Sequence, residues 1–86
     1  MSISLERYRH GVREVHAELM MHPDGRTLTE ISYATKIARS SLQVILEDNP
    51  LFYVDRWVMG RNTAAARIWA LNISSNFEDC PRPDSL

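Results

Sequence analysis

The sequence predicts a small α+β domain that is mainly helical, with three helices followed by a two-stranded β-hairpin. Apolar residues recur at helical spacing near the N-terminus, and two shorter helical stripes follow a turn-forming cluster. Two runs rich in aromatic and β-branched residues then flank a turn that contains glycine. With 86 residues, of which 44% are hydrophobic and 24% charged, the chain has the composition of one ordinary globular domain.

The first predicted helix spans about residues 5–21. Its apolar residues lie three or four positions apart and form one stripe: Leu5, Tyr8, Val12, Val15 and Leu19. Ser4 is the expected N-cap, because its hydroxyl can accept a hydrogen bond from a free N–H of the first turn. The turn-forming cluster 23–25 ends the helix near His22.

Two shorter helices are predicted within about residues 28–48, joined by the three residues 35–37. Thr27 and Glu30 have the spacing of a capping box and mark the start of the first one. The second covers about residues 38–48, and Pro50 follows its end. The apolar stripe predicted to face the core in this helix is Ala38, Leu42, Ile45 and Leu46.

The β-hairpin is predicted from strands at 51–59 and 67–73, with a turn at 60–63. The first strand is apolar on both faces, since Phe52, Val54 and Val58 alternate with Tyr53, Trp57 and Met59. One face meets the helices, and the other is either an exposed partner surface or is covered by helix one or the tail. The folded domain is expected to span 1–74, followed by a flexible acidic tail at 75–86.

An acidic residue, an aliphatic residue, an alanine, a turn and an Arg-Ser-Ser helix opening follow one another in the middle of the chain. They stand at Glu30, Ile31, Ala34, Ile37, Arg39, Ser40 and Ser41, with Leu46 closing the pattern. This segment resembles the helix-turn-helix of IclR-type and related bacterial regulators, and 67–71 is similar to the returning wing strand of small winged-helix regulators. The resemblance covers about residues 5–73. It implies a winged helix-turn-helix fold in a small phage, plasmid or bacterial transcription regulator that binds double-stranded DNA.

The charge distribution agrees with a local DNA-binding strip. The whole chain has a net charge of −1, but residues 26–67 carry six cations and four acids, which leaves +2 between two acidic flanks. A solvated surface with scattered charge is the alternative interpretation. The residues expected to contact phosphates or bases from the third helix and the turn before it are Lys36, Arg39, Ser40, Ser41, Gln43 and Val44. Ser40 and Ser41 are also candidates for capping this helix.

The hairpin turn adds Arg61, Asn62 and Arg67 as wing residues that reach the DNA backbone or the minor groove. The leading alternative function is a protein-binding adaptor or inhibitor that acts on a polymerase, nuclease or regulator. It would bind through the apolar hairpin residues Tyr53, Trp57 and Met59 and through the acidic flanks. Val44 favours this alternative, because related regulators often carry a basic residue there. A homodimer formed through helix one or through the hairpin is a further hypothesis.

Other classes of function find little support in the sequence. The three histidines are six residues apart, so they do not share one helix face, and the single cysteine excludes an internal disulfide. Catalytic motifs and cofactor-binding loops are not recognised, and no apolar run reaches the length of a membrane span. We therefore expect a cytoplasmic protein that is not an enzyme and needs no metal or cofactor.

Overall fold

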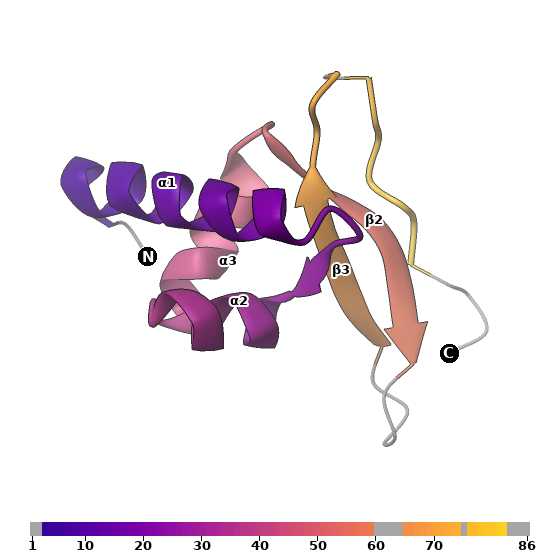
Figure 1. Ribbon diagram of the computed structural model, residues 1–86, viewed down its shortest axis with the longest axis horizontal. Helices are drawn as coiled ribbons and strands as arrows, with labels where there is room; N and C mark the ends of the chain where they lie inside the picture. The colour runs from indigo at the N-terminus through magenta and orange to yellow at the C-terminus, as the bar shows by residue number, and fades with distance from the viewer. Residues whose placement is uncertain (1–2, 60–64, 75, 83–86) are drawn as a thin grey trace.

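The computed structural model describes residues 3–59, 65–74 and 76–82. Within them the chain forms a small α+β fold of three helices and a three-stranded antiparallel sheet, in the order α1, β1, α2, α3, β2, β3. The strands lie in the order β1-β3-β2, and the helices gather on one side of the sheet (Figure 1). The predicted α+β class and the order of three helices before a hairpin are confirmed.

Helix α1, Leu5–Met21, has the predicted bounds. The Ser4 hydroxyl accepts a hydrogen bond from the backbone N–H of Arg7 at 3.2 Å, as the N-cap prediction requires. Leu5, however, is 63% exposed, so the inward stripe begins only one turn later. Gly11 is buried, and a Cβ atom there would fall on the Ile45 side chain. The absence of a side chain at Gly11 therefore allows α1 to lie close to the following helices.

Helix α2, Leu28–Thr35, begins with the predicted capping box. Glu30 N–H donates to the Thr27 hydroxyl at 3.2 Å, and Thr27 N–H donates to the Glu30 carboxylate at 2.9 Å. Helix α3, Arg39–Asp48, follows after residues 36–38. Ala38 is exposed at its N-cap position, so the prediction that Ala38 faces the core is wrong. The apolar stripe of α3 begins at Leu42, after the helix has completed its first turn.

Strand β1, Arg26–Thr27, is an element that the sequence did not reveal. Its residues pair with the middle of β3, since Arg26 lies opposite Trp69. Gly25 enters this strand with a φ of 96°, and a Cβ atom there would lie 3.0 Å from the Trp69 carbonyl oxygen. Glycine lets the chain pass close to β3 at this position, and the start of α2 is thereby fixed against the sheet.

Strands β2, Phe52–Met59, and β3, Ala65–Leu71, form the hairpin. Their register shifts between Val54 and Arg56, which makes a β-bulge at Asp55. Val54 lies opposite Trp69 and Trp57 lies opposite Arg67. Because Arg67 and Trp69 are two residues apart on one strand, they share a face, and Val54 and Trp57 share it with them. The predicted alternation, which placed Val54 and Trp57 on opposite faces, is therefore wrong beyond the bulge.

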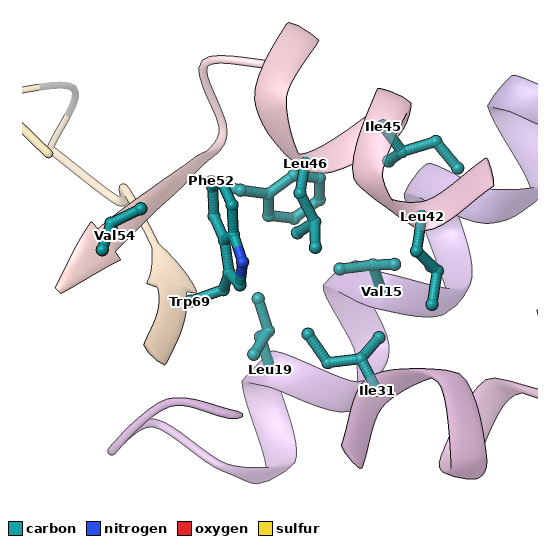
Figure 2. Close-up of a cluster of buried hydrophobic side chains, with 9 residues drawn as sticks. All are labelled: Val15, Leu19, Ile31, Leu42, Ile45, Leu46, Phe52, Val54 and Trp69. Atoms are coloured by element: carbon teal, nitrogen blue, oxygen red, sulfur yellow. The ribbon is translucent and has the colours of Figure 1, made fainter. Parts of the chain in front are cut away.

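One hydrophobic core joins the helices to the sheet. Figure 2 shows side chains from all three helices converging on residues of β2 and β3. The buried cluster consists of Val15, Leu19, Ile31, Leu42, Ile45, Leu46, Phe52, Val54 and Trp69. Trp69 is only 3% exposed and packs against residues of the helices, so the second strand of the hairpin is as much a part of the core as α1.

The C-terminal segment 76–82 runs along the outer edge of β2 (Figure 1). Cys80 N–H donates to the Val54 carbonyl at 2.8 Å, and Val54 N–H donates to the Asp79 carboxylate at 2.8 Å. Trp57 Nε1–H donates to the Cys80 carbonyl at 2.9 Å. This segment belongs to the acidic tail predicted at 75–86, and its hydrogen bonds pair the Val54 backbone groups at the edge of the sheet.

Candidate functional site

The outward face of α3 carries five of the residues predicted to contact DNA. Arg39, Ser40 and Gln43 are exposed, and Ser41 and Val44 are half-buried. The opposite face packs into the core through Leu42, Ile45 and Leu46. Helical spacing therefore places the polar residues on one side of the molecule and leaves their side chains available to a ligand.

The start of α3 lacks the cap that the start of α2 has. Ala38 occupies the N-cap position, and no side chain accepts a hydrogen bond there. Ser40 and Ser41 lie inside the first turn, so the prediction that they cap the helix is wrong. The backbone N–H groups of this turn are left without a side-chain acceptor, and the helix dipole adds a partial positive charge at the same end.

Two cations stand beside this helix start. Lys36 lies at the C-cap of α2 with a left-handed φ of 60°, and its N–H donates to the Ser32 carbonyl at 2.8 Å. Both Lys36 and Arg39 are exposed. Within the part of the chain that the structure describes, no carboxylate lies within 4.0 Å of either side chain. Positive charge thus collects at the turn between α2 and α3.

Arg67 forms an ion pair and a cation–π contact within the chain. Its guanidinium lies 3.4 Å from the Glu47 carboxylate, in the last turn of α3, and 5.1 Å from the centre of the Trp69 ring. These contacts fix the end of α3 against β3 and neutralise Glu47, which is also exposed on α3. The sequence offers no signal for this pair, because the two residues are twenty positions apart.

Arg26 is another cation that is already engaged. It forms an ion pair with Glu30 at 3.1 Å, and its guanidinium also lies 2.9 Å from the His22 ring and 4.0 Å from Glu18. Arg26 lies in β1, one residue before the N-cap Thr27, so this ion pair joins the strand to the first turn of α2. The group holds the end of α1 against the start of α2.

The positive charge of segment 26–67 is therefore unevenly available. Arg26 and Arg67 are paired as described, and Arg56 lies 2.8 Å from the Asp55 carboxylate while also donating to the Asp24 carbonyl at 2.7 Å. The predicted wing residues Arg61 and Asn62 lie outside the described residues. Within the described residues of this segment, the cations that remain available to an external anion are Lys36 and Arg39, at the turn between α2 and α3.

The three hairpin residues predicted to bind a protein partner do not form one surface. Tyr53 stacks on Phe77 of the C-terminal segment, with ring centroids 5.1 Å apart, and its hydroxyl donates to Asp55. Trp57 is half-buried against the core cluster, and its Nε1–H donates to the Cys80 carbonyl, whereas Met59 is 60% exposed. The bulge puts Tyr53 on the face opposite Trp57 and Met59. Of the alternatives left open by the sequence, coverage by the tail is the one observed for Tyr53, whereas Trp57 packs against the core.

The shifted pKa values belong to structural hydrogen bonds. Donation from the Thr27 backbone N–H lowers the pKa of Glu30, and donation from the Tyr53 hydroxyl lowers the pKa of Asp55. Burial raises the pKa of Tyr8 and of Tyr53, and a bond to a carboxylate raises each of them further. All four groups lie away from the outward face of α3. The chemistry that this face offers is hydrogen bonding and fixed positive charge.

Two other kinds of site are absent from the described residues. Histidine, cysteine and acidic side chains do not gather there in groups of three suited to a metal ion. The helices of this part of the chain are too short or too polar to cross a lipid bilayer.

Comparisons of the chain with protein-family models, with curated proteins and with solved structures find no match.

Proposed function

We propose that this chain is a winged-helix DNA-binding domain of a transcription regulator. Helix α3 is its recognition helix in the major groove, and the hairpin is its wing on the DNA backbone or in the minor groove. The order of three helices and a hairpin supports this, together with a third helix whose outward face carries exposed polar residues. Double-stranded DNA is the ligand.

The observation that carries the proposal is the open start of α3. Its first-turn N–H groups have no side-chain cap, and Lys36 and Arg39 stand beside them with no acid nearby in the described residues. A helix N-terminus flanked by two such cations suits a phosphate oxygen, because the N–H groups donate to it and both side chains supply charge.

Gln43 and Val44 are assigned to base contacts one turn further along the helix. A glutamine side chain can donate to and accept from the edge of adenine, and valine can pack against the methyl group of thymine. Glu47 lies on the same exposed side, where a bare carboxylate would repel phosphate. Its pairing with Arg67 reduces this repulsion, so Arg67 acts here as a positioning residue for α3 and the wing.

The test is the salt dependence of binding to a random-sequence duplex. Wild-type affinity should fall steeply with salt, and Arg39→Ala should reduce the slope by about one phosphate's worth. Arg7→Ala is the matched control, since Arg7 is an exposed arginine on α1. Equal effects of the two substitutions would remove α3 from the interface, and no binding at low salt would overturn the proposal.

The protein-binding alternative has one observation in its favour. Val58 and Met59, at the end of β2, are 39% and 60% exposed. Among the described residues of β2 and β3, they are the exposed large apolar side chains. An absence of DNA binding, together with a protein partner lost on Met59→Ser, would favour an adaptor or inhibitor.

A further inference from the structure

An exposed apolar surface lies where α1 meets the open end of the hairpin, at the start of β2 and the end of β3. One hollow is lined by Leu19, Met20, Pro23, Leu71 and Ile73. A second hollow shares Leu71 and Ile73 and extends to His16, Leu51 and Asn72. Ile73 is 85% exposed and Met20 is 62% exposed, and both line the same hollow. A contiguous apolar surface that is exposed to water is typical of an interaction site. We call Met20, Leu51, Leu71 and Ile73 the apolar face.

The apolar face has basic residues along α1. Arg9, Arg13, His16 and Met20 recur at intervals of three or four, so they form one stripe that leads along the helix toward the apolar face. Arg9 and Arg13 are exposed, and within the described residues neither has a carboxylate within 4.0 Å. The stripe therefore presents two arginine charges that are available to a partner.

Acidic residues lie on the side of the apolar face where Asn72 is found. A third hollow shares Asn72 and is lined by Asp48, Phe77, Glu78 and Asp79, among others. Asp48 and Asp79 already accept hydrogen bonds from Tyr8 and from the Val54 backbone. Glu78 is exposed and has no ion-pair partner in the described part of the chain. An apolar centre thus has unpaired arginines along its helix and an unpaired acid beyond its other end.

We propose that this surface is the interface of a homodimer, with a second copy of this chain as its occupant. In a two-fold interface the same patch meets itself, so residues at one end of the patch face residues at the other end in the second copy. Contact of the two apolar faces would bring Arg13 of each copy toward Glu78 of the other. A surface with one sign of charge on each side is self-complementary under this symmetry, whereas a uniformly basic or acidic rim would repel its own copy.

The test is sedimentation of the full chain over a range of concentrations. The wild type should associate to a dimer, and Ile73→Asp should raise the dissociation constant by at least about tenfold, because it places a charge at the centre of the interface. Tyr33→Asp is the matched control: Tyr33 is 87% exposed, lies on α2 away from the apolar face, and its substitution should leave the dimer unchanged.

A charge reversal separates self-association from a general loss of solubility or folding. Arg13→Glu and Glu78→Arg should each weaken the dimer, and the protein that carries both should regain most of the wild-type affinity, since each reversed charge again meets its opposite. A wild type that stays monomeric would overturn the proposal, and so would a dimer insensitive to Ile73→Asp or a double reversal without recovery. The inference does not rest on DNA binding, so its failure would leave the proposed function standing.

Discussion

Helices α2 and α3 begin in opposite ways. At the start of α2, Thr27 and Glu30 satisfy each other's backbone N–H groups, and Arg26 adds an ion pair to the same carboxylate. At the start of α3, Ala38 provides no side-chain acceptor. The two helices are neighbours in the chain and both pack on the same core, so their difference concerns the solvent-facing ends and not their burial.

This difference indicates which helix is structural and which is open to a ligand. A capped start contributes to stability, and its side chains occupy first-turn N–H groups that an external anion could otherwise use. An uncapped start forgoes that stability and keeps the donors available, here beside Lys36 and Arg39. The following substitutions test whether the start of α2 serves folding and the start of α3 serves binding.

The largest effect is expected at Gly25, which positions the start of α2 against the sheet. Gly25→Ala would force a side chain into a φ of 96° and against the Trp69 carbonyl oxygen, so the free energy of unfolding should fall by about 2 kcal/mol or more. Chemical denaturation measures this. Asp24→Ala is the control, because within the described residues Asp24 accepts a hydrogen bond, from Arg56, through its backbone carbonyl alone. Equal stability of the two variants would contradict the role given to Gly25.

Removal of the α2 cap should have a smaller effect. Thr27→Ala deletes the hydroxyl that accepts from Glu30 N–H, and the expected loss is about 1 kcal/mol of unfolding free energy. The matched variant is Thr29→Ala. Thr29 lies two residues after Thr27, is exposed and takes no part in the capping box. DNA affinity per folded molecule should stay at the wild-type level, and a drop in affinity would show that α2 is not purely structural.

Addition of a cap to α3 should change stability and binding in opposite directions. Ala38→Ser supplies an acceptor for the first-turn N–H groups, and we expect a gain of about 0.5 to 1 kcal/mol in the free energy of unfolding with weaker DNA binding. Ala38→Asp caps the helix as well and adds a negative charge beside Arg39, so its DNA binding should be weaker still. Unchanged DNA affinity in both variants would mean that the start of α3 is not a phosphate site.

The helices were predictable from the sequence because their signals are local. The apolar spacing of α1, the capping box of Thr27 and Glu30, and Pro50 after α3 each act within a few residues, and the structure follows them closely. The face of α3 that carries Arg39 and Gln43 follows from the same periodicity. The DNA-binding role of that face remains a prediction.

The remaining features depend on pairings between distant residues. The bulge at Asp55 is set by the register of β2 against β3, and it moves Trp57 to the face that simple alternation gives to Val58. The bond between Val54 and Cys80 joins an edge strand to an acidic, proline-containing segment, which has no periodic signal of its own. Such a pairing also involves a residue of the candidate site. Arg67 was predicted to contact the DNA backbone, and in the structure its guanidinium forms an ion pair with the Glu47 carboxylate.

The smallest expected effect is the pH dependence of the α2 cap. Donation from Thr27 N–H lowers the pKa of Glu30 in the folded chain, so the stabilisation is complete above the pKa of the unfolded state and is lost as pH falls through the folded value. Glu30→Gln has no charge to titrate, and the stability advantage of the wild type over this variant should shrink from about pH 5 downward. Denaturation of both proteins across this range measures the difference, in which the lowered pKa of Asp55 cancels because both proteins contain it. A constant difference at all pH values would show that the Glu30 carboxylate is not held in its charged form.

In Ala38→Asp the same experiment should reveal a new loss of stability at low pH, because that substitution gives α3 the acidic cap that only α2 has in the wild type.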